Sequence, residues 1–324
     1  ASIPDVKRIG TWWFPALIAG CLLASCTPQK VVERPHPGEE NPPPFLPVEG
    51  KASPDDIARF LAGRPVQQGE ILSNLQRTPE YAQHESSMRG MWTGLTRNRV
   101  ARMEDWSQQN LQSSTSGDSV LFYPFGGPDL LHAEALFGNI PTKILMGLEP
   151  VGWLPDFEAM NGPDVLSALP AYRESTRTQM QTGYFITKEM KTDLDNSVLR
   201  GVTPIVLATV SLMGGTVENV SAMMAGPYQA VRIDYLNRTG GRRAAIYVSG
   251  DLSNGGFGNY RAFLDSFGRG STYFKAASYL MHEDYFSQAR DYFLTASNNI
   301  VEDDSGIPFR HFAAETWDIR FYGN

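Results

Sequence analysis

A strand, a glycine-containing turn, a helix and a second strand follow one another over residues 119–150, and this order constrains the fold more than any other feature of the chain. Val120–Tyr123 is a short apolar run, and residues 143–148 form a second one. Between them, Pro124-Phe125-Gly126-Gly127-Pro128-Asp129 is a tight turn whose last two residues suit the start of a helix. Two strands joined by a helix lie parallel in one sheet. The segment therefore predicts an α/β fold.

Further segments continue this alternation of helices and strands. Residues 203–213 are apolar and predict a buried helix. Apolar residues alternate over 231–235 and again over 244–248, with a glycine-containing turn at 237–241, which predicts a hairpin. A helical stripe of apolar residues covers 286–296.

Capping residues mark two more helices. Ser53 precedes Pro54 and two aspartates, a combination typical of a helix start, and Gly63 suits its end. Thr187 suits the start of another helix, with apolar residues following at helical spacing.

The end of the chain is expected to extend the sheet. Residues 272–280 predict a strand, and residues 317–322 predict a last one after the turn at Asp303-Asp304-Ser305-Gly306. This closing order is similar to that of methyltransferase-like domains, whose sheets end in an antiparallel hairpin. We therefore expect an α/β, Rossmann-like (methyltransferase-like) fold with a largely parallel sheet, a C-terminal antiparallel hairpin and an N-terminal helical extension over residues 55–112.

A positive pair, an apolar run and a cysteine open the chain. Lys7-Arg8 precedes residues 9–23, a run shorter than the roughly 20 apolar residues needed to cross a bilayer as a helix but suited to the core of a signal peptide. Leu23-Ala24-Ser25-Cys26 resembles the lipobox of bacterial lipoproteins, in which the cysteine thiol takes a diacylglyceryl group. We expect residues 1–25 to be a lipoprotein signal peptide and Cys26 to be lipidated. Lipidation of Cys21, a transmembrane anchor and an ordinary buried helix are the alternatives.

The residues after Cys26 predict the location of the protein and its spacing from the membrane. Thr27, and not aspartate, follows the cysteine. By resemblance to lipoprotein sorting in Gram-negative bacteria, this predicts the outer membrane, facing the periplasm. Residues 27–54 contain eight prolines and few large apolar side chains, too few to offset the entropy of ordering. We expect a disordered, Pro-rich tether over residues 26–54 and a single α/β domain over residues 55–324.

Charge and cysteine content exclude several classes of protein. The formal net charge is -7, which disfavours binding to nucleic acid through bulk charge. Both cysteines lie in the first 26 residues, so the rest of the chain cannot form an internal disulfide or a cysteine zinc site. The motifs G-x-S-x-G, H-E-x-x-H, Walker A and G-x-G-x-x-G are absent. We expect no cofactor and no metal.

The turn after the first strand and the end of the second are candidate ligand-binding positions. Gly126 and Gly127 allow close backbone approach at a helix start, and Asp129 follows them. The alternative is a structural turn in which Asp129 caps the helix. Glu149, at the end of the second strand, could accept a hydrogen bond from a ribose hydroxyl or hold its own turn.

Catalytic candidates lie near the C-terminal half of the predicted sheet. Lys275 and His282 flank the end of the strand expected over 272–280, and His282 suits general acid/base chemistry. Asp303 and Asp304 offer paired carboxylates. Each has a structural alternative: a packing or capping histidine, and an ordinary Asp-Ser-Gly turn.

Four stretches together resemble an uncharacterised family of bacterial secreted or lipid-anchored proteins. They are residues 121–129, Gly147-Leu148-Glu149-Pro150, residues 275–282 and residues 303–308. The resemblance covers roughly residues 55–324 and supports export, but it implies no catalytic residues. We expect an envelope lipoprotein that binds a ligand or an envelope protein partner. The alternative is an envelope enzyme, of hydrolase or transferase type, with a cleft at the carboxyl ends of the strands.

Overall fold

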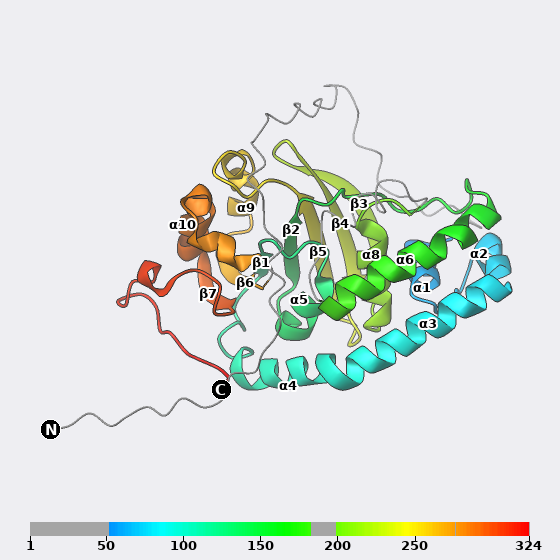
Figure 1. Ribbon diagram of the computed structural model, residues 1–324, viewed down its shortest axis with the longest axis horizontal. Coiled ribbons are helices and arrows are strands. Elements are labelled where there is room, and N and C mark those ends of the chain that lie inside the picture. The colour runs from blue at the N-terminus through cyan, green and yellow to red at the C-terminus, as the bar shows by residue number, and fades with distance from the viewer. Residues whose placement is uncertain (1–51, 183–198, 276, 324) are drawn as a thin grey trace, which may run out of the picture. The chain divides into compact units, whose positions relative to one another are not determined.

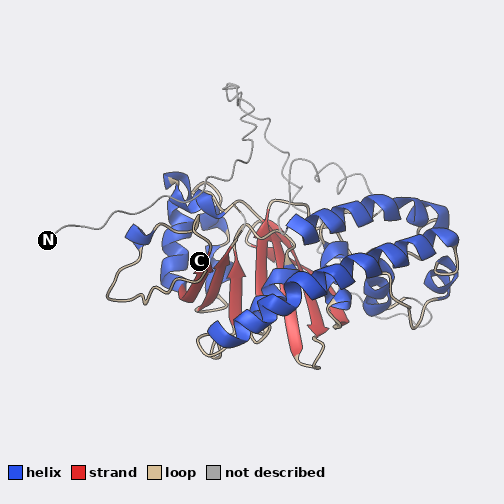
Figure 2. Cartoon of the chain, turned by 60° about the horizontal axis from the view of Figure 1, so that its bottom comes forward, coloured by secondary structure: helices blue, strands red, loops and turns tan. Residues whose placement is uncertain are grey.

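A seven-stranded mixed sheet forms the centre of the protein, so the predicted α/β class is confirmed. The computed structural model describes residues 52–182, 199–275 and 277–323, all within one compact unit. Along the chain the strands are β1 (Val120–Tyr123), β2 (Thr142–Gly147), β3 (Thr216–Ala225), β4 (Tyr228–Leu236), β5 (Arg242–Ser249), β6 (Gly270–Phe274) and β7 (Ser297–Glu302). Their order across the sheet is β3-β4-β5-β2-β1-β6-β7 (Figure 1), and Figure 2 shows the strands in red among the helices in blue.

Strands β5, β2, β1, β6 and β7 run parallel, and β4 runs antiparallel to both of its neighbours. From β1 the chain first proceeds to β2 on one side and later returns to β6 on the other side. The direction of winding therefore reverses between β1 and β6. In open α/β sheets, such a reversal leaves a crevice at the carboxyl ends of the two strands.

Helices cover both faces of the sheet (Figure 1). Their bounds are α1 (Pro54–Leu61), α2 (Glu70–Leu75), α3 (Pro79–Leu95), α4 (Ala101–Asn110), α5 (Leu130–Phe137), α6 (Gly162–Thr182), α8 (Thr203–Leu212), α9 (Arg261–Asp265) and α10 (Ser287–Ala296). A π-helical turn, η1 (Thr96–Val100), joins α3 to α4, and short 3₁₀ turns are η2 (Phe257–Asn259), η3 (Ser278–His282), η4 (Asp284–Phe286) and η5 (Phe309–His311). None of the helices in the described ranges is long and apolar enough to span a bilayer.

The two faces of the sheet carry separate apolar cores, because side chains alternate along each strand. In β1, Leu121 and Tyr123 belong to the core that includes residues of α1, α5 and α8, whereas Val120 and Phe122 belong to the core that includes residues of α9 and α10. All four side chains are buried. Burial on both faces explains why β1 reads as a continuous apolar run in the sequence.

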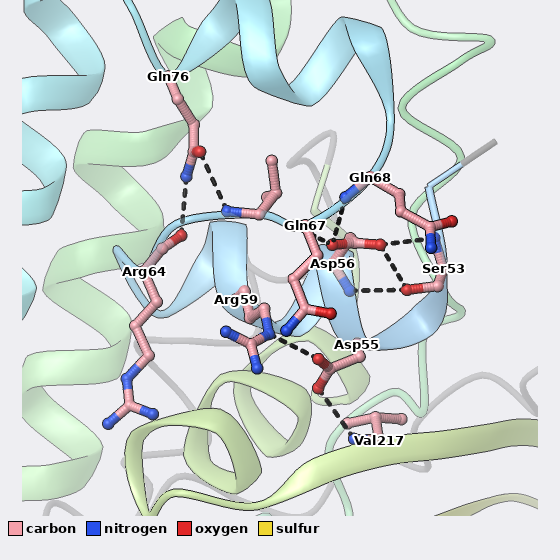
Figure 3. A network of polar contacts seen from close by, with 10 residues as sticks. Ser53, Asp55, Asp56, Arg59, Arg64, Gln67, Gln68, Gln76 and Val217 are labelled. Carbon is pink, nitrogen blue, oxygen red and sulfur yellow. Dashed lines mark hydrogen bonds and ion pairs between the residues drawn. The ribbon is translucent and has the colours of Figure 1, made fainter. Parts of the chain in front are cut away.

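The predicted start of the first helix is confirmed. Ser53 caps α1: its hydroxyl accepts a bond from the amide of Asp56, and the Asp56 carboxylate accepts one from the Ser53 amide (Figure 3). A Ser cap contributes about 1 kcal/mol to stability. Oδ1 of Asp56 also accepts the amides of Gln67 and Gln68, so it fixes the chain that leaves α1 (Figure 3).

The second aspartate ties α1 to the sheet. Oδ1 of Asp55 accepts the amide of Val217 in β3 at 3.0 Å, and Oδ2 pairs with Arg59 (Figure 3). Strand β3 is at the edge of the sheet. The acidic start of α1 therefore anchors the helix as well as capping it.

The prediction of a C-terminal antiparallel hairpin is wrong. Antiparallel pairing is found instead in the middle of the chain, over β3, β4 and β5, and includes the predicted hairpin with its turn at 237–241. Residues 317–322 follow η5 and form no strand, because they do not pair with the sheet. Phe321 and Tyr322 are exposed. The strand expected over 272–280 ends at Phe274, and a 3₁₀ turn follows from Ser278.

Several other expectations fall on residues that the structure does not describe. The signal peptide, Cys21, Cys26, most of the tether and the helix after Thr187 lie outside the described residues.

Candidate functional site

An ion pair joins two sequence-predicted residues across the reversal of the sheet. Asp129 begins α5 after β1, and Lys275 follows directly after β6. Lys275 Nζ lies 3.4 Å from Asp129 Oδ2. The Asp129 side chain is buried, whereas that of Lys275 is 23% exposed. A cation accessible from outside is therefore held on a buried carboxylate at the carboxyl edge.

Four groups stabilise the Asp129 carboxylate. Oδ1 accepts the amide of His132 at 3.2 Å and lies 2.8 Å from His132 Nδ1, while Oδ2 accepts the Tyr123 hydroxyl at 2.8 Å and pairs with Lys275. Burial acts to raise the pKa of Asp129, but the charges and hydrogen bonds of these neighbours outweigh it and hold the pKa below its ordinary value. Asp129 therefore stays ionised. It caps α5, as one of the two sequence interpretations predicts.

Lys275 lies in a mixed field of charges. Burial lowers its pKa most strongly; Arg99 lowers it further, and Asp129 and Asp303 act in the opposite direction without restoring the ordinary value. Arg99 belongs to the π-helical turn η1 and Asp303 follows β7. Single π-helical turns occur often at functional sites. Charged groups therefore gather around Lys275 from the loops after β1, β6 and β7 and from the turn η1.

Hydroxyl groups adjoin this region. The Ser278 hydroxyl lies 2.6 Å from that of Ser305 and donates to Asp303 Oδ1 at 3.1 Å. Asp303 Oδ1 also accepts the amide and the hydroxyl of Ser305. Ala277, just before Ser278, has a left-handed backbone with φ of 51°. Such strain in a residue with a side chain is concentrated at functional sites.

The glycine turn has an internal explanation. A Cβ on Gly126 would lie 2.6 Å from the Tyr123 ring, so the ring requires glycine at this position. The amides of Gly126, Gly127 and Asp129 donate to the carbonyls of Tyr123, Met146 and Gly126. Phe125 has a φ of 60°, which tightens the turn. Because these amides bond within the protein, ligand binding by Gly126 and Gly127 stays a prediction.

Glu149 is buried beside the next strand of the sheet. Tyr247 of β5 donates its hydroxyl to Glu149 Oε2 at 3.0 Å and to the Glu149 carbonyl at 2.9 Å. The chain after it is fixed as well, because the Val202 amide donates to the carbonyls of Pro150 and Val151. Glu149 therefore holds its own turn against β5, and a role in ribose binding stays a prediction.

The remaining catalytic candidates do not join the Asp129–Lys275 pair. His282 and Asp304 are exposed. Within the described residues, no hydrogen bond or ion pair links His282 to Asp129, Glu149 or Asp303. Nor does the described part of the chain contain a group of three or more His, Cys, Asp or Glu side chains able to hold a metal ion.

Sequence reasoning missed the partners of Asp129 and Asp303. His132 follows the capping Asp129 at the third position of α5, which places its ring beside the cap. Ser305 is part of the Asp-Ser-Gly turn and bonds Asp303 locally. The sequence has no signal for Tyr123 or Ser278, because their contacts depend on how distant strands pack.

No protein-family model, curated protein or solved structure matches the chain.

Proposed function

We propose that the protein is a lipid-anchored component of the bacterial cell envelope that binds a ligand bearing an anionic group at the carboxyl edge of a Rossmann-like sheet. The anchor rests on Lys7-Arg8, the apolar run and Leu23-Ala24-Ser25-Cys26. The binding site rests on one observation, the partly exposed Lys275 held on the buried Asp129 at the reversal of the sheet.

The strand order supports the Rossmann-like interpretation. The five parallel strands are β1, β2, β5, β6 and β7. If they are numbered 1 to 5 along the chain, their order across the sheet is 3-2-1-4-5. Doubly wound sheets have this order and bind ligands where the winding reverses. The hairpin of β3 and β4 extends the sheet beyond β5, so the methyltransferase-like part of the analogy has less support.

Charge favours an anionic group on the ligand. Lys275 and Arg99 lie close enough for Arg99 to lower the pKa of Lys275. An anion bound near these two cations would reduce the repulsion between them.

An envelope enzyme is the second candidate. The lowered pKa of Lys275, caused mainly by burial, is a property of lysines that act as general bases. His282 and Asp304, which the sequence suggested for this chemistry, are not bonded to Lys275 among the described residues.

Binding of small anions tests the site. Inorganic phosphate and succinate, as phosphoryl and carboxylate probes, are titrated into the full-length protein in detergent. Replacing Lys275 by Met is expected to weaken binding at least about tenfold, and Lys275→Arg to retain it, because arginine keeps the charge. Equal affinity of the wild type and Lys275→Met would contradict the proposal. Thermal unfolding of each variant shows whether the fold is kept, since Asp129 retains His132 and Tyr123.

Metabolic labelling tests the anchor. In a Gram-negative host, radiolabelled palmitate is expected to enter the wild type and Cys21→Ser but not Cys26→Ser. Label that persists in Cys26→Ser and disappears in Cys21→Ser would move the lipid to Cys21. An unlabelled wild type would reject the lipoprotein assignment.

A further inference from the structure

A second polar site lies at the opposite, amino edge of the parallel strands. A cavity of about 390 Å³ lies among α4, α5, α8 and the turn between β4 and β5. Its volume falls in the range of sites for small molecules. It shares no lining residue with the Asp129–Lys275 region.

A buried ion pair forms one wall of the cavity. Glu134, a lining residue of α5, accepts Lys143 Nζ at 2.5 Å and the Tyr235 hydroxyl at 2.8 Å, both on Oε2. Lys143 is wholly buried in β2 and also donates to the Ile140 carbonyl. A Cβ atom added to the lining residue Gly138 would lie 4.0 Å from Glu134 Oε1. This carboxylate oxygen offers an acceptor to a donor in the cavity.

A cation borders the cavity at its surface. The Arg238 side chain, in the turn between β4 and β5, is 60% exposed, and its Nη1 pairs with Glu104 of α4 at 2.9 Å. Within the described residues, Nε and Nη2 of Arg238 make no hydrogen bond. Arg243 is different, because all three of its nitrogens donate to the carbonyls of Gly138 and Arg242. Of its five N–H groups Arg243 has three engaged, whereas Arg238 uses only Nη1 among the described residues and is more exposed, so Arg238 has more donors to offer a ligand.

The rest of the wall includes apolar side chains. Leu130, Val210 and Met213 line the cavity together with Tyr235. A ligand that fits this lining has an anionic group for Arg238, a donor for Glu134 and an apolar body for these side chains.

We propose that the cavity binds a free α-amino acid with a hydrophobic side chain. The carboxylate pairs with Arg238, the ammonium donates to Glu134 Oε1, and the side chain packs on Leu130, Val210 and Met213. Lys143 pairs with Glu134 Oε2 at the base of the cavity and leaves Oε1 for the ligand.

Calorimetric titration of L-methionine into the full-length protein in detergent tests the proposal. Binding is expected at micromolar to millimolar concentrations, and Arg238→Gln is expected to weaken it at least about tenfold. Arg242→Gln is the matched control, because Arg242 is 87% exposed on the neighbouring strand and does not line the cavity. This control is expected to bind as the wild type does.

Ligand analogues separate the two charged contacts. N-acetyl-L-methionine lacks the ammonium and L-methioninamide lacks the carboxylate, so each is expected to bind at least about tenfold more weakly than L-methionine. No heat with millimolar L-methionine, or equal affinity of Arg238→Gln and the wild type, would overturn the proposal. Equal affinity for either analogue would do the same.

Discussion

Replacing Lys143 by methionine is expected to lower the free energy of unfolding by about 3–5 kcal/mol, because it leaves a buried carboxylate without its cation. Glu134 is 11% exposed and has Lys143 as its ion-pair partner. Methionine has a length similar to that of lysine and fills the apolar part of the site, so the loss reports on charge and less on packing. Urea denaturation of the wild type and of the variant measures the difference.

A second substitution is expected to restore most of this loss. In Lys143→Met with Glu134→Gln, the glutamine is neutral and its carbonyl still accepts the Tyr235 hydroxyl. Arg177→Met removes an exposed ion pair with Glu174 and is the control, with an expected effect within about 0.5 kcal/mol. A loss below about 1 kcal/mol for Lys143→Met alone would contradict this account.

Acidification is expected to destabilise the protein through His84, by up to about 3 kcal/mol. His84 is a buried residue of α3, and its Nε2 lies 3.0 Å from the carbonyl of Leu61 in α1. Since a carbonyl only accepts, Nε2 donates, and Nδ1 is buried without a hydrogen-bond partner among the described residues. Burial lowers the pKa of His84 from its ordinary 6.5 to about 4, and Arg173 adds to the effect.

The direction of this pH effect depends on whether the folded or the unfolded state binds the proton more readily. Above pH 6.5 the ring is neutral in both states, so His84 adds no pH dependence. As the pH falls from 6.5 towards 4, the unfolded chain takes up a proton that the folded protein refuses, and stability is lost. Glu302 acts in the opposite direction, because burial raises its pKa to about 7 and the folded protein binds that proton more readily.

The comparison that isolates His84 is between pH profiles of variants. His84→Gln cannot titrate and retains a donor for the Leu61 carbonyl, so its free energy of unfolding is expected to increase relative to that of the wild type as the pH falls from about 7 to about 4.5. His282→Gln, at an exposed position, is expected to follow the wild type. Parallel profiles for His84→Gln and the wild type would show that another group titrates.

Local patterns in the sequence predict the parts of the fold that local chemistry determines. The apolar runs and the Gly-Pro-Asp turn predict β1, α5 and β2, and alternation around residues 237–241 predicts β4 and β5. Residues 317–322 also alternate, but a strand needs a neighbour with free backbone groups, and none pairs with them. The end of the chain could not be predicted from pattern alone.

In the candidate site, too, local sequence predicts single residues but not the contacts between distant ones. Asp129 and Lys275 could each be selected from the sequence, but their contact spans 146 residues and depends on the reversal of the sheet. Lys143 lies inside the apolar run of β2, and a lysine buried there needs an acidic partner. The partner, Glu134, is on the preceding helix. The sequence could therefore have predicted this ion pair.

The bond from Val217 to Asp55 has a consequence for solubility. A strand at the margin of a sheet exposes backbone groups that can recruit strands from other molecules, which is a route to aggregation. In β3 the second residue already donates its amide to α1, and a bulge follows between Val217 and Asn219. The helix that begins the described part of the chain therefore blocks the pairing of another strand at the start of β3.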